Sequence, residues 1–172
     1  MVVVTIAGIL ATLAFVSLRR HSSASKRVEP LSMVQSIRAA QERYRAQYML
    51  YLNVSTDNNW YPRSVLDAAN RYKVGSFLLP PEEGHPDNAR WLDLRPTSIG
   101  NVQFGYITKA GVAGQTPPAP SSPTGFTGFA WPVATDNWYV IEALGDTDWD
   151  GTRASYLAGS ITGAVMRVND GE

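Results

Sequence analysis

The chain has 172 residues, of which 44% are hydrophobic, 17% charged and 10% aromatic. This composition is typical of an ordinary folded domain and excludes a disordered tail or a collagen-like repeat. Fifteen basic residues balance fifteen acidic ones, so the net charge gives no reason to expect a nucleic-acid-binding protein. Because the chain has no cysteine, disulfides, iron–sulfur ligation and thiol catalysis are excluded.

Charge and hydropathy are distributed unevenly along the chain. Residues 1–52 contain seven basic and two acidic residues, whereas residues 53–172 contain eight basic and thirteen acidic residues. Residues 1–18 have no charged residue at all. As a helix they would be about 27 Å long, just short of the hydrocarbon thickness of roughly 30 Å. Their large apolar side chains would favour insertion by roughly 3–6 kcal/mol, so the sequence predicts a membrane segment of marginal length.

A cleaved signal peptide is the alternative for this apolar segment. Such a peptide begins with basic residues and ends at a small-residue cleavage site. Here no basic residue precedes Val2, and Arg19 and Arg20 directly follow Leu18. We therefore expect residues 1–18 to remain part of the mature protein.

A helical pattern of apolar residues continues beyond the apolar segment. The residues three or four positions apart that form one stripe are Val34, Ile37, Ala40, Tyr44, Tyr48 and Tyr51. The polar residues on the opposite side are Arg38, Gln41, Glu42, Arg45 and Gln47. The pattern predicts one nearly continuous helix over residues 1–52, about 75–80 Å long if unbroken. Pro30 should kink this helix, because proline lacks the N–H that would bond to residue 26 and its ring crowds that carbonyl group.

The run Met-Val-Val-Val-Thr-Ile-Ala-Gly-Ile-Leu-Ala-Thr-Leu-Ala (Met1 to Ala14) resembles the hydrophobic N-terminal signature of type IV pilins. The order of residues around Gly8 carries this resemblance, which is close over the N-terminal part of the chain and loose over the C-terminal part. The resemblance implies an α+β fold in which a long N-terminal α-helical stem packs on a small antiparallel β-sheet head. It also implies that a basic leader and a Phe-Thr-Leu-Ile-Glu-Leu run would immediately precede Met1, and that the first mature residue would carry a methylation.

Residues 53–172 are numerous enough to form a globular head with its own core. A capping-box-like start at Ser64 predicts a short helix over residues 64–73. Segments rich in β-branched and aromatic residues predict five short strands at residues 102–108, 126–131, 138–144, 153–158 and 163–168. Irregular loops are expected at residues 79–96 and 116–125, which are rich in proline. We expect the strands to form an antiparallel sheet that lies on the amphipathic half of the long helix.

An acidic turn in the head suggests a possible cation site. Asp146, Asp148, Asp150 and Gly151 repeat the spacing of the first positions of an EF-hand calcium loop. Position twelve of such a loop would be Leu157, where a bidentate Glu is required. The favoured interpretation is a hairpin turn in which Asp side chains accept hydrogen bonds from backbone N–H groups and Gly151 has a positive φ. No cofactor is therefore expected, and calcium at the three aspartates stays open as the alternative.

Other candidate sites offer little material for catalysis. The two histidines, His21 and His85, are too few for a zinc site or a Ser-His-Asp triad, and His85 is expected to be a solvated loop residue. Adjacent Glu82 and Glu83 are expected to be solvated, because paired-carboxylate glycosidases need carboxylates on both sides of a bond. A stacking platform for sugars or nucleic acid is conceivable, but packing in the core or between subunits is favoured for Trp60, Trp91, Trp131, Trp138 and Trp149. We expect no enzymatic activity.

The resemblance implies that the chain is the structural subunit of an extracellular type IV pilus, or fimbrium, which forms by helical assembly of the N-terminal helices. Small residues allow close approach of helices, and a repeated contact whose rotation does not close produces a filament. The residues expected to pack in the filament core are Val4, Ala7, Gly8, Ala11, Ala14 and Phe15. The alternatives are a pseudopilin of a type II secretion-like apparatus and a membrane-anchored periplasmic binding domain.

The resemblance also implies partners and a location. The partners would be other copies of the chain, a prepilin peptidase and the assembly machinery of the inner membrane, and no nucleic-acid partner is predicted. The protein would reside in the bacterial inner membrane before assembly and in an extracellular filament afterwards. The sequence leaves open whether such a filament serves motility, cell adhesion, DNA uptake or secretion, and whether the chain is a major or a minor subunit.

Overall fold

The computed structural model describes residues 28–62, 75–78, 84–98, 101–146 and 151–170. The apolar segment 1–18, the predicted helix 64–73, Glu82, Glu83 and Trp149 lie outside these described residues. The elements are α2 (Val28–Tyr48), β1 (Gly75–Ser76), α3 (Asn88–Leu94), β2 (Asn101–Val102), β3 (Gly105–Gly111), a 3-10 turn (Ser122–Thr124), β4 (Trp138–Gly145), β5 (Ala154–Gly159) and β6 (Met166–Val168).

The expected long helical stem over residues 1–52 is wrong. The helix that packs on the sheet, α2, has 21 residues, and the only other described α-helix, α3, has seven. The stem was expected to continue to residue 52, but α2 ends at Tyr48 because Met49 adopts a left-handed conformation with φ 61°. The Met49 N–H still bonds to the carbonyl of Arg45 at 2.8 Å, which closes the last turn before the chain reverses.

Pro30 stands in the first turn of α2 as the structure describes it, and it is buried. A proline is tolerated there, because the first N–H groups of a helix have no partner within the helix. The carbonyl group of residue 26, which the ring was expected to crowd, lies outside the described residues. The predicted kink at Pro30 therefore stays a prediction.

The head is built on a four-stranded antiparallel sheet in the order β3-β4-β5-β6. Consecutive strands are neighbours, and β4 pairs with β3 from Trp138 to Leu144 and with β5 from Val140 to Gly145. Four of the five predicted strand regions carry these strands, whereas residues 126–131 form no strand and belong to the connection between β3 and β4. Gly128 has φ 75° within that region, and its aromatic residues cover the sheet instead of extending it.

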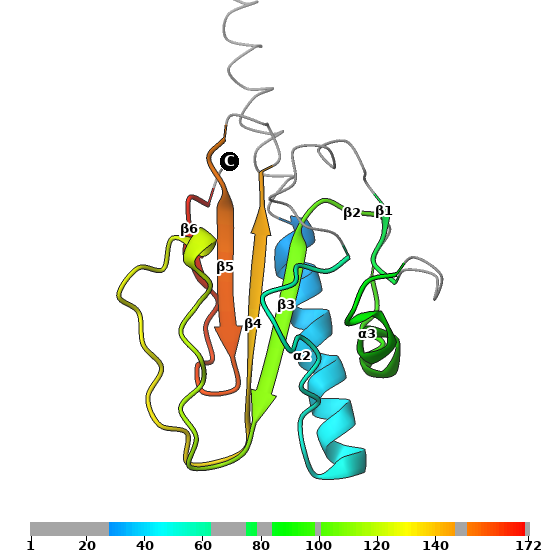
Figure 1. Ribbon diagram of the computed structural model, residues 1–172, viewed down its shortest axis with the longest axis vertical. Coiled ribbons are helices and arrows are strands. Elements are labelled where there is room, and N and C mark those ends of the chain that lie inside the picture. The colour runs from blue at the N-terminus through cyan, green and yellow to red at the C-terminus, as the bar shows by residue number, and fades with distance from the viewer. Residues whose placement is uncertain (1–27, 63–74, 79–83, 99–100, 147–150, 171–172) are drawn as a thin grey trace, which may run out of the picture.

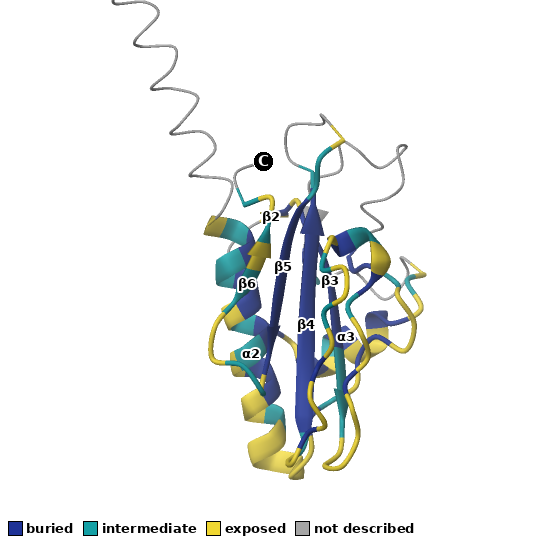
Figure 2. Ribbon diagram, turned by 90° about the vertical axis from the view of Figure 1, so that its left-hand side faces the viewer, coloured by how far each residue is buried: buried dark blue, intermediate teal, exposed yellow. Residues whose placement is uncertain are grey.

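Helix α2 lies against one face of this sheet (Figure 1). Its apolar stripe, with Met33, Val34, Ile37 and Ala40, meets the side chains that alternate along β4 and β5. The sheet residues in this cluster include Tyr139, Ile141, Ala143, Tyr156 and Ala158. Figure 2 shows that β4 and β5 are buried along their whole length, whereas the C-terminal end of α2 is exposed. The helix is therefore packed over most of its length and free only at its last turns.

The connection between β3 and β4, residues 112–137, covers the opposite face of the sheet. A second hydrophobic cluster forms beneath it from Trp131, Ala134, Trp138, Val140 and Leu157. All four described tryptophans are buried, at 0–5% exposure. None of the four therefore presents a ring for stacking on a sugar or a base, which agrees with the expected role in packing.

The outer edge of β3 is covered by the chain that follows α2. Backbone hydrogen bonds join Ser55 to Thr108 at 2.9 Å and Tyr61 to Tyr106 at 3.0 and 2.7 Å. Beyond this segment lies α3, which was not expected because residues 79–96 read as an irregular loop. Trp91 of α3 stacks on Tyr61 with ring centroids 5.0 Å apart and meets Phe77 edge-on at 5.1 Å. This aromatic cluster ties α3 to the sheet edge.

Candidate functional site

The side chains of α2 attach the helix to the head at successive levels. At each level a polar side chain crosses to backbone groups of a distant part of the chain, so the attachment does not depend on apolar packing alone. The side chains concerned are Glu29, Ser36, Arg38, Gln41 and Arg43. We call these five side chains the α2 clamp.

Glu29 forms the level nearest the start of α2. Its Oε1 accepts hydrogen bonds from the N–H groups of Gln103 at 2.8 Å and Phe104 at 3.1 Å and from the Tyr106 hydroxyl at 3.2 Å. Burial raises the pKa of the Glu29 carboxyl, and the two backbone donors and the Tyr106 hydroxyl partly oppose this shift. Glu29 thus fixes the entry into β3 to the helix.

Arg38 and Ser36 attach the middle of α2. The Arg38 guanidinium donates to the carbonyl oxygens of Thr162, Gly163 and Ala164 at 3.1–3.4 Å, which lie in the turn between β5 and β6. The Ser36 hydroxyl donates to the carbonyl of Thr97 at 2.6 Å on the other side of the helix. These contacts attach both the β5–β6 turn and the segment that follows α3 to helix α2.

Gln41 holds the chain reversal that follows α2. It is fully buried, and its Nε2 donates to the Leu52 carbonyl at 2.9 Å and to the Thr108 hydroxyl at 3.3 Å. Its Oε1 accepts the Leu52 N–H at 3.0 Å. One amide side chain thereby satisfies both backbone groups of Leu52. The sequence periodicity placed Gln41 on the polar side of the helix. It is buried in the structure because the chain that turns back after α2 packs against this side.

Arg43 attaches α2 to α3. Its Nη2 donates to the carbonyls of Leu94 at 2.6 Å and Arg95 at 3.0 Å. These carbonyls end α3, where the last turn of a helix leaves acceptors without a partner in the helix. A cation is also favourable at that end of the helix dipole. Arg43 therefore both caps α3 and fastens it to α2.

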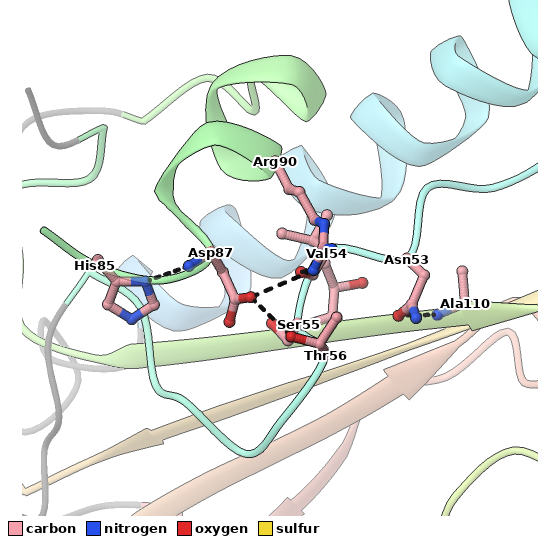
Figure 3. A network of polar contacts seen from close by, with 9 residues as sticks. Asn53, Val54, Ser55, Thr56, His85, Asp87, Arg90 and Ala110 are labelled. Atoms are coloured by element: carbon pink, nitrogen blue, oxygen red, sulfur yellow. Dashed lines mark hydrogen bonds and ion pairs between the residues drawn. The ribbon is translucent and has the colours of Figure 1, made fainter. Parts of the chain in front are cut away.

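A polar network joins α3 to the segment that covers β3 (Figure 3). Asp87 is buried, and its Oδ1 accepts a hydrogen bond from the Thr56 hydroxyl at 3.2 Å and lies 3.6 Å from Arg90 Nη1. The Asp87 N–H donates to His85 Nδ1 at 3.1 Å, and His85 Nε2 lies 3.2 Å from the Trp60 carbonyl. His85 is therefore not the solvated loop residue that was expected. It is half-buried, and its two ring nitrogens have partners.

The acidic turn is described only at its two ends. Asp146 Oδ2 accepts the Gly151 N–H at 3.1 Å, and Gly151 has φ 92°. This is the arrangement expected of a hairpin turn. Asp148 and Asp150 lie outside the described residues, so the calcium prediction stays open. Among the residues that the structure does describe, no three His, Asp or Glu side chains are grouped to hold a metal ion.

A cleft of about 430 Å³ opens beside the C-terminal end of α2. It is lined by Arg45 and Tyr51, by residues 132–137 and by Ser160 and Ile161. The Arg45 guanidinium donates to the Tyr51 hydroxyl at 2.9 Å, which itself donates to Glu42 at 2.9 Å. Next to the cleft, Tyr48, Met49 and Leu50 are 54%, 77% and 48% exposed. Apolar side chains are therefore exposed at the last residue of α2 and in the chain reversal that follows it.

Glu142 holds the β3–β4 connection to the face of the sheet that α2 does not cover. It is 1% exposed, and its Oε2 accepts the Ser121 N–H at 2.9 Å. Burial raises the pKa of the Glu142 carboxyl, and the Ser121 N–H and the Lys109 charge oppose the shift. The folded protein therefore binds this proton more tightly than the unfolded chain does.

This shift predicts the direction of a pH effect. Glu142 contributes most to stability below its unfolded pKa, which is close to the ordinary glutamate value of 4.5, and the contribution is lost as the pH rises through the higher folded pKa. The difference in unfolding free energy between Glu142→Gln and the unmodified chain should therefore shift in favour of the variant as the pH rises from 4 to 7. Urea unfolding at each pH measures it, with Val133→Ala as a variant that adds no titratable change. A pH-independent difference would contradict the assignment.

The residues expected to pack in a filament core, Val4, Ala7, Gly8, Ala11, Ala14 and Phe15, all lie outside the described residues. Their role stays a prediction. Within the described part of the chain, neither helix has both the length and the hydropathy that a membrane crossing needs. What the sequence did not reveal is the α2 clamp, since each of its members looks like an ordinary polar residue on a helix surface.

Comparison of this chain with protein-family models, with curated proteins and with solved structures finds no match.

Proposed function

We propose that this chain is the structural subunit of an extracellular type IV pilus-like filament, held in the bacterial inner membrane by residues 1–18 until it is assembled. The main support for this proposal is the α2 clamp, the five side chains that bond helix α2 to the head. Helix α2 begins at residue 28, and the uncharged segment lies before it in the chain. Any force on the N-terminal segment therefore reaches a helix that is fastened to β3, to the β5–β6 turn and to α3.

Such fastening is what a filament subunit requires. In a filament, the N-terminal segments hold the copies together and the heads must not be pulled off them. The apolar packing of α2 on the sheet supplies most of this resistance, and the hydrogen bonds of the clamp add contacts of fixed direction to backbone groups. Glu29, Arg38 and Arg43 together bond to three separate regions of the head.

Assembly is energetically feasible for the uncharged segment. Its apolar side chains lose little on moving from lipid to a wall of similar side chains, and Ala7, Gly8 and Ala11 would let helices approach closely. A heterologous contact repeated with a rotation that does not close produces an open filament. A prepilin peptidase and an inner-membrane assembly machinery are the partners that this proposal entails.

The second candidate function is a membrane-anchored periplasmic binding domain. The observation that favours it is the cleft beside α2, whose volume of about 430 Å³ lies in the range of small-molecule sites. A pseudopilin of a secretion apparatus would be built like the pilus subunit and would differ in forming only a short fibre.

The packing role of the N-terminal segment is tested at Gly8. Replacing Gly8 by Phe should abolish fibres, because the bulky ring keeps neighbouring helices apart, and should leave the head folded. Gly8→Ala is the matched control and should still assemble. Electron microscopy of material sheared from cells, with circular dichroism of each purified chain, gives the two readouts. Normal fibres from Gly8→Phe would remove the packing argument.

A further inference from the structure

The cleft beside the C-terminal end of α2 has charges of both signs in its lining. Arg45 belongs to the last turn of α2, and Asp136 belongs to the connection between β3 and β4. The apolar part of the lining includes Pro132, Val133 and Ile161. The volume of about 430 Å³ is sufficient for a molecule of the size of an amino acid. This lining suits a small ligand that has a positive charge, a negative charge and an apolar group.

The Arg45 guanidinium is held in place by Tyr51. Its Nη1 donates to the Tyr51 hydroxyl at 2.9 Å, and its central carbon lies 5.1 Å from the centre of the Tyr51 ring. Tyr51 is 8% exposed, packs edge-on against Tyr139 and donates to Glu42, which does not line the cleft. Among the described residues, Nε and Nη2 of Arg45 have no hydrogen-bond partner. These two groups form an edge that can pair with both oxygens of a carboxylate.

Asp136 provides the negative charge of the cleft. It is exposed, and its carboxylate has no hydrogen bond or ion pair with any residue that the structure describes. The hydrogen bond to Tyr51 raises the pKa of the Arg45 guanidinium, and the charge of Asp136 acts in the same direction. The two charges therefore influence each other within one cleft without forming an ion pair. A ligand can place a carboxylate at Arg45 and an ammonium group at Asp136.

The two sides of the cleft are joined to each other before a ligand binds. Asn137 Nδ2 donates to the Met49 carbonyl at 3.2 Å, and Asn137 Oδ1 accepts the Ala113 N–H at 3.3 Å. The same limb of the connection is fixed by a hydrogen bond from the Gly114 N–H to the Ala134 carbonyl at 2.7 Å. A cleft that already has its shape loses less conformational entropy when a ligand binds.

We propose that this cleft binds a free α-amino acid with an apolar side chain. The ligand carboxylate pairs with Nε and Nη2 of Arg45, and the ligand ammonium group pairs with the Asp136 carboxylate. The ligand side chain lies on the apolar lining, which includes Val133 and Ile161. A ligand with a single charge would leave the opposite charge of the cleft without a partner, so the lining is complementary to a zwitterion.

The affinity follows from the exposure of the site. Both charged residues are exposed, so each ion pair contributes modestly and the dissociation constant is about 1 mM. The inference does not depend on whether the chain forms filaments. It gives a ligand class to the binding domain that is the second candidate function.

Three related molecules test the two charges of the ligand separately. L-Leucine has both charges, isocaproate lacks the ammonium group, and isoamylamine lacks the carboxylate. Each is titrated into the full chain in mild detergent, with the backbone amide signals followed by nuclear magnetic resonance. Leucine should shift the signals of residues 133–137 and 160–161 and approach saturation at about 10 mM. Isocaproate and isoamylamine should each bind at least about fivefold more weakly, because each lacks one ion pair.

Two variants of the cleft should change the affinities in opposite patterns. Arg45→Met should weaken leucine binding at least about fivefold and leave isoamylamine binding unchanged. Asp136→Asn should weaken leucine binding by a similar factor and leave isocaproate binding unchanged. Arg95→Met and Asp93→Asn make the same charge changes at exposed positions outside the cleft and are the matched controls. Circular dichroism should show all four variants folded.

Each of three results would overturn the inference. The first is the absence of any saturable shift with leucine up to about 10 mM. The second is binding of isocaproate or isoamylamine as tight as that of leucine, because one charge of the ligand would then not be recognised. The third is a leucine affinity in Arg45→Met or Asp136→Asn equal to that of its control. None of these results depends on fibre yield, so the filament proposal is tested separately.

Discussion

Replacing Trp91 by alanine is expected to lower the free energy of unfolding by about 3–5 kcal/mol. The indole is fully buried, and its ring contacts Tyr61 and Phe77. Because Tyr61 also bonds to the edge of β3, the cavity would loosen both α3 and the chain that covers the sheet edge. Urea unfolding of the full chain in mild detergent, followed by far-ultraviolet circular dichroism, measures the loss.

The matched control is Trp91→Phe. It keeps an aromatic ring in the cluster and removes an indole N–H that has no acceptor among the described residues. Its cost should therefore stay under about 2 kcal/mol. Equal losses for the two variants would show that the cluster does not depend on a ring at this position.

The replacement Gln41→Met is expected to destabilise the protein by about 1–3 kcal/mol. Methionine has a similar length but cannot bond to Leu52, so the N–H and carbonyl of half-buried Leu52 lose their partner in the protein. Gln47→Met, on the exposed last turn of α2, is the control and should change stability little. The same urea titration compares them. A loss no larger than that of Gln47→Met would contradict the role given to Gln41.

The central part of α2 was predictable because its apolar stripe is fixed by helical spacing. Val34, Ile37 and Ala40 are buried as that spacing required. The pattern failed at the end of the helix, where Tyr48 is 54% exposed. Tyrosine is compatible with both a core and a surface, so periodicity alone could not show that the chain turns away from the helix at Met49.

The strands of the sheet were predictable for a similar reason. Trp138–Gly145 is a run of apolar residues with one charge, and both of its faces are covered, as such a run indicates. Residues 126–131 have the same aromatic composition but no register with a neighbour. Their aromatic residues cover the second face of the sheet, which is a tertiary arrangement that composition cannot distinguish from a strand.

Helix α3 was missed because prolines and a glycine flank it. A weak signal was present: Trp91 and Leu94 are three residues apart and both point into the core. A helix of seven residues is not stable by itself, and here it is held by the aromatic cluster and by Arg43. Local sequence could not have revealed either contact.

The candidate site was the least predictable part. Each side chain of the α2 clamp bonds to backbone atoms. Because every residue type has a backbone, the sequence does not show which residues will be the partners. Arg38 and Gln41 were assigned to the polar side of the helix. Both side chains do make polar contacts, but Gln41 is buried and the Arg38 guanidinium bonds to carbonyl groups of the β5–β6 turn.

Electron microscopy of fibres sheared from the host, with the constituent protein identified by intact mass, decides whether this chain is a filament subunit. We expect long fibres composed of this chain, with residues 1–18 still present. A mature protein that begins after Leu18, or one that keeps the segment and stays a dispersed monomer, would contradict this expectation.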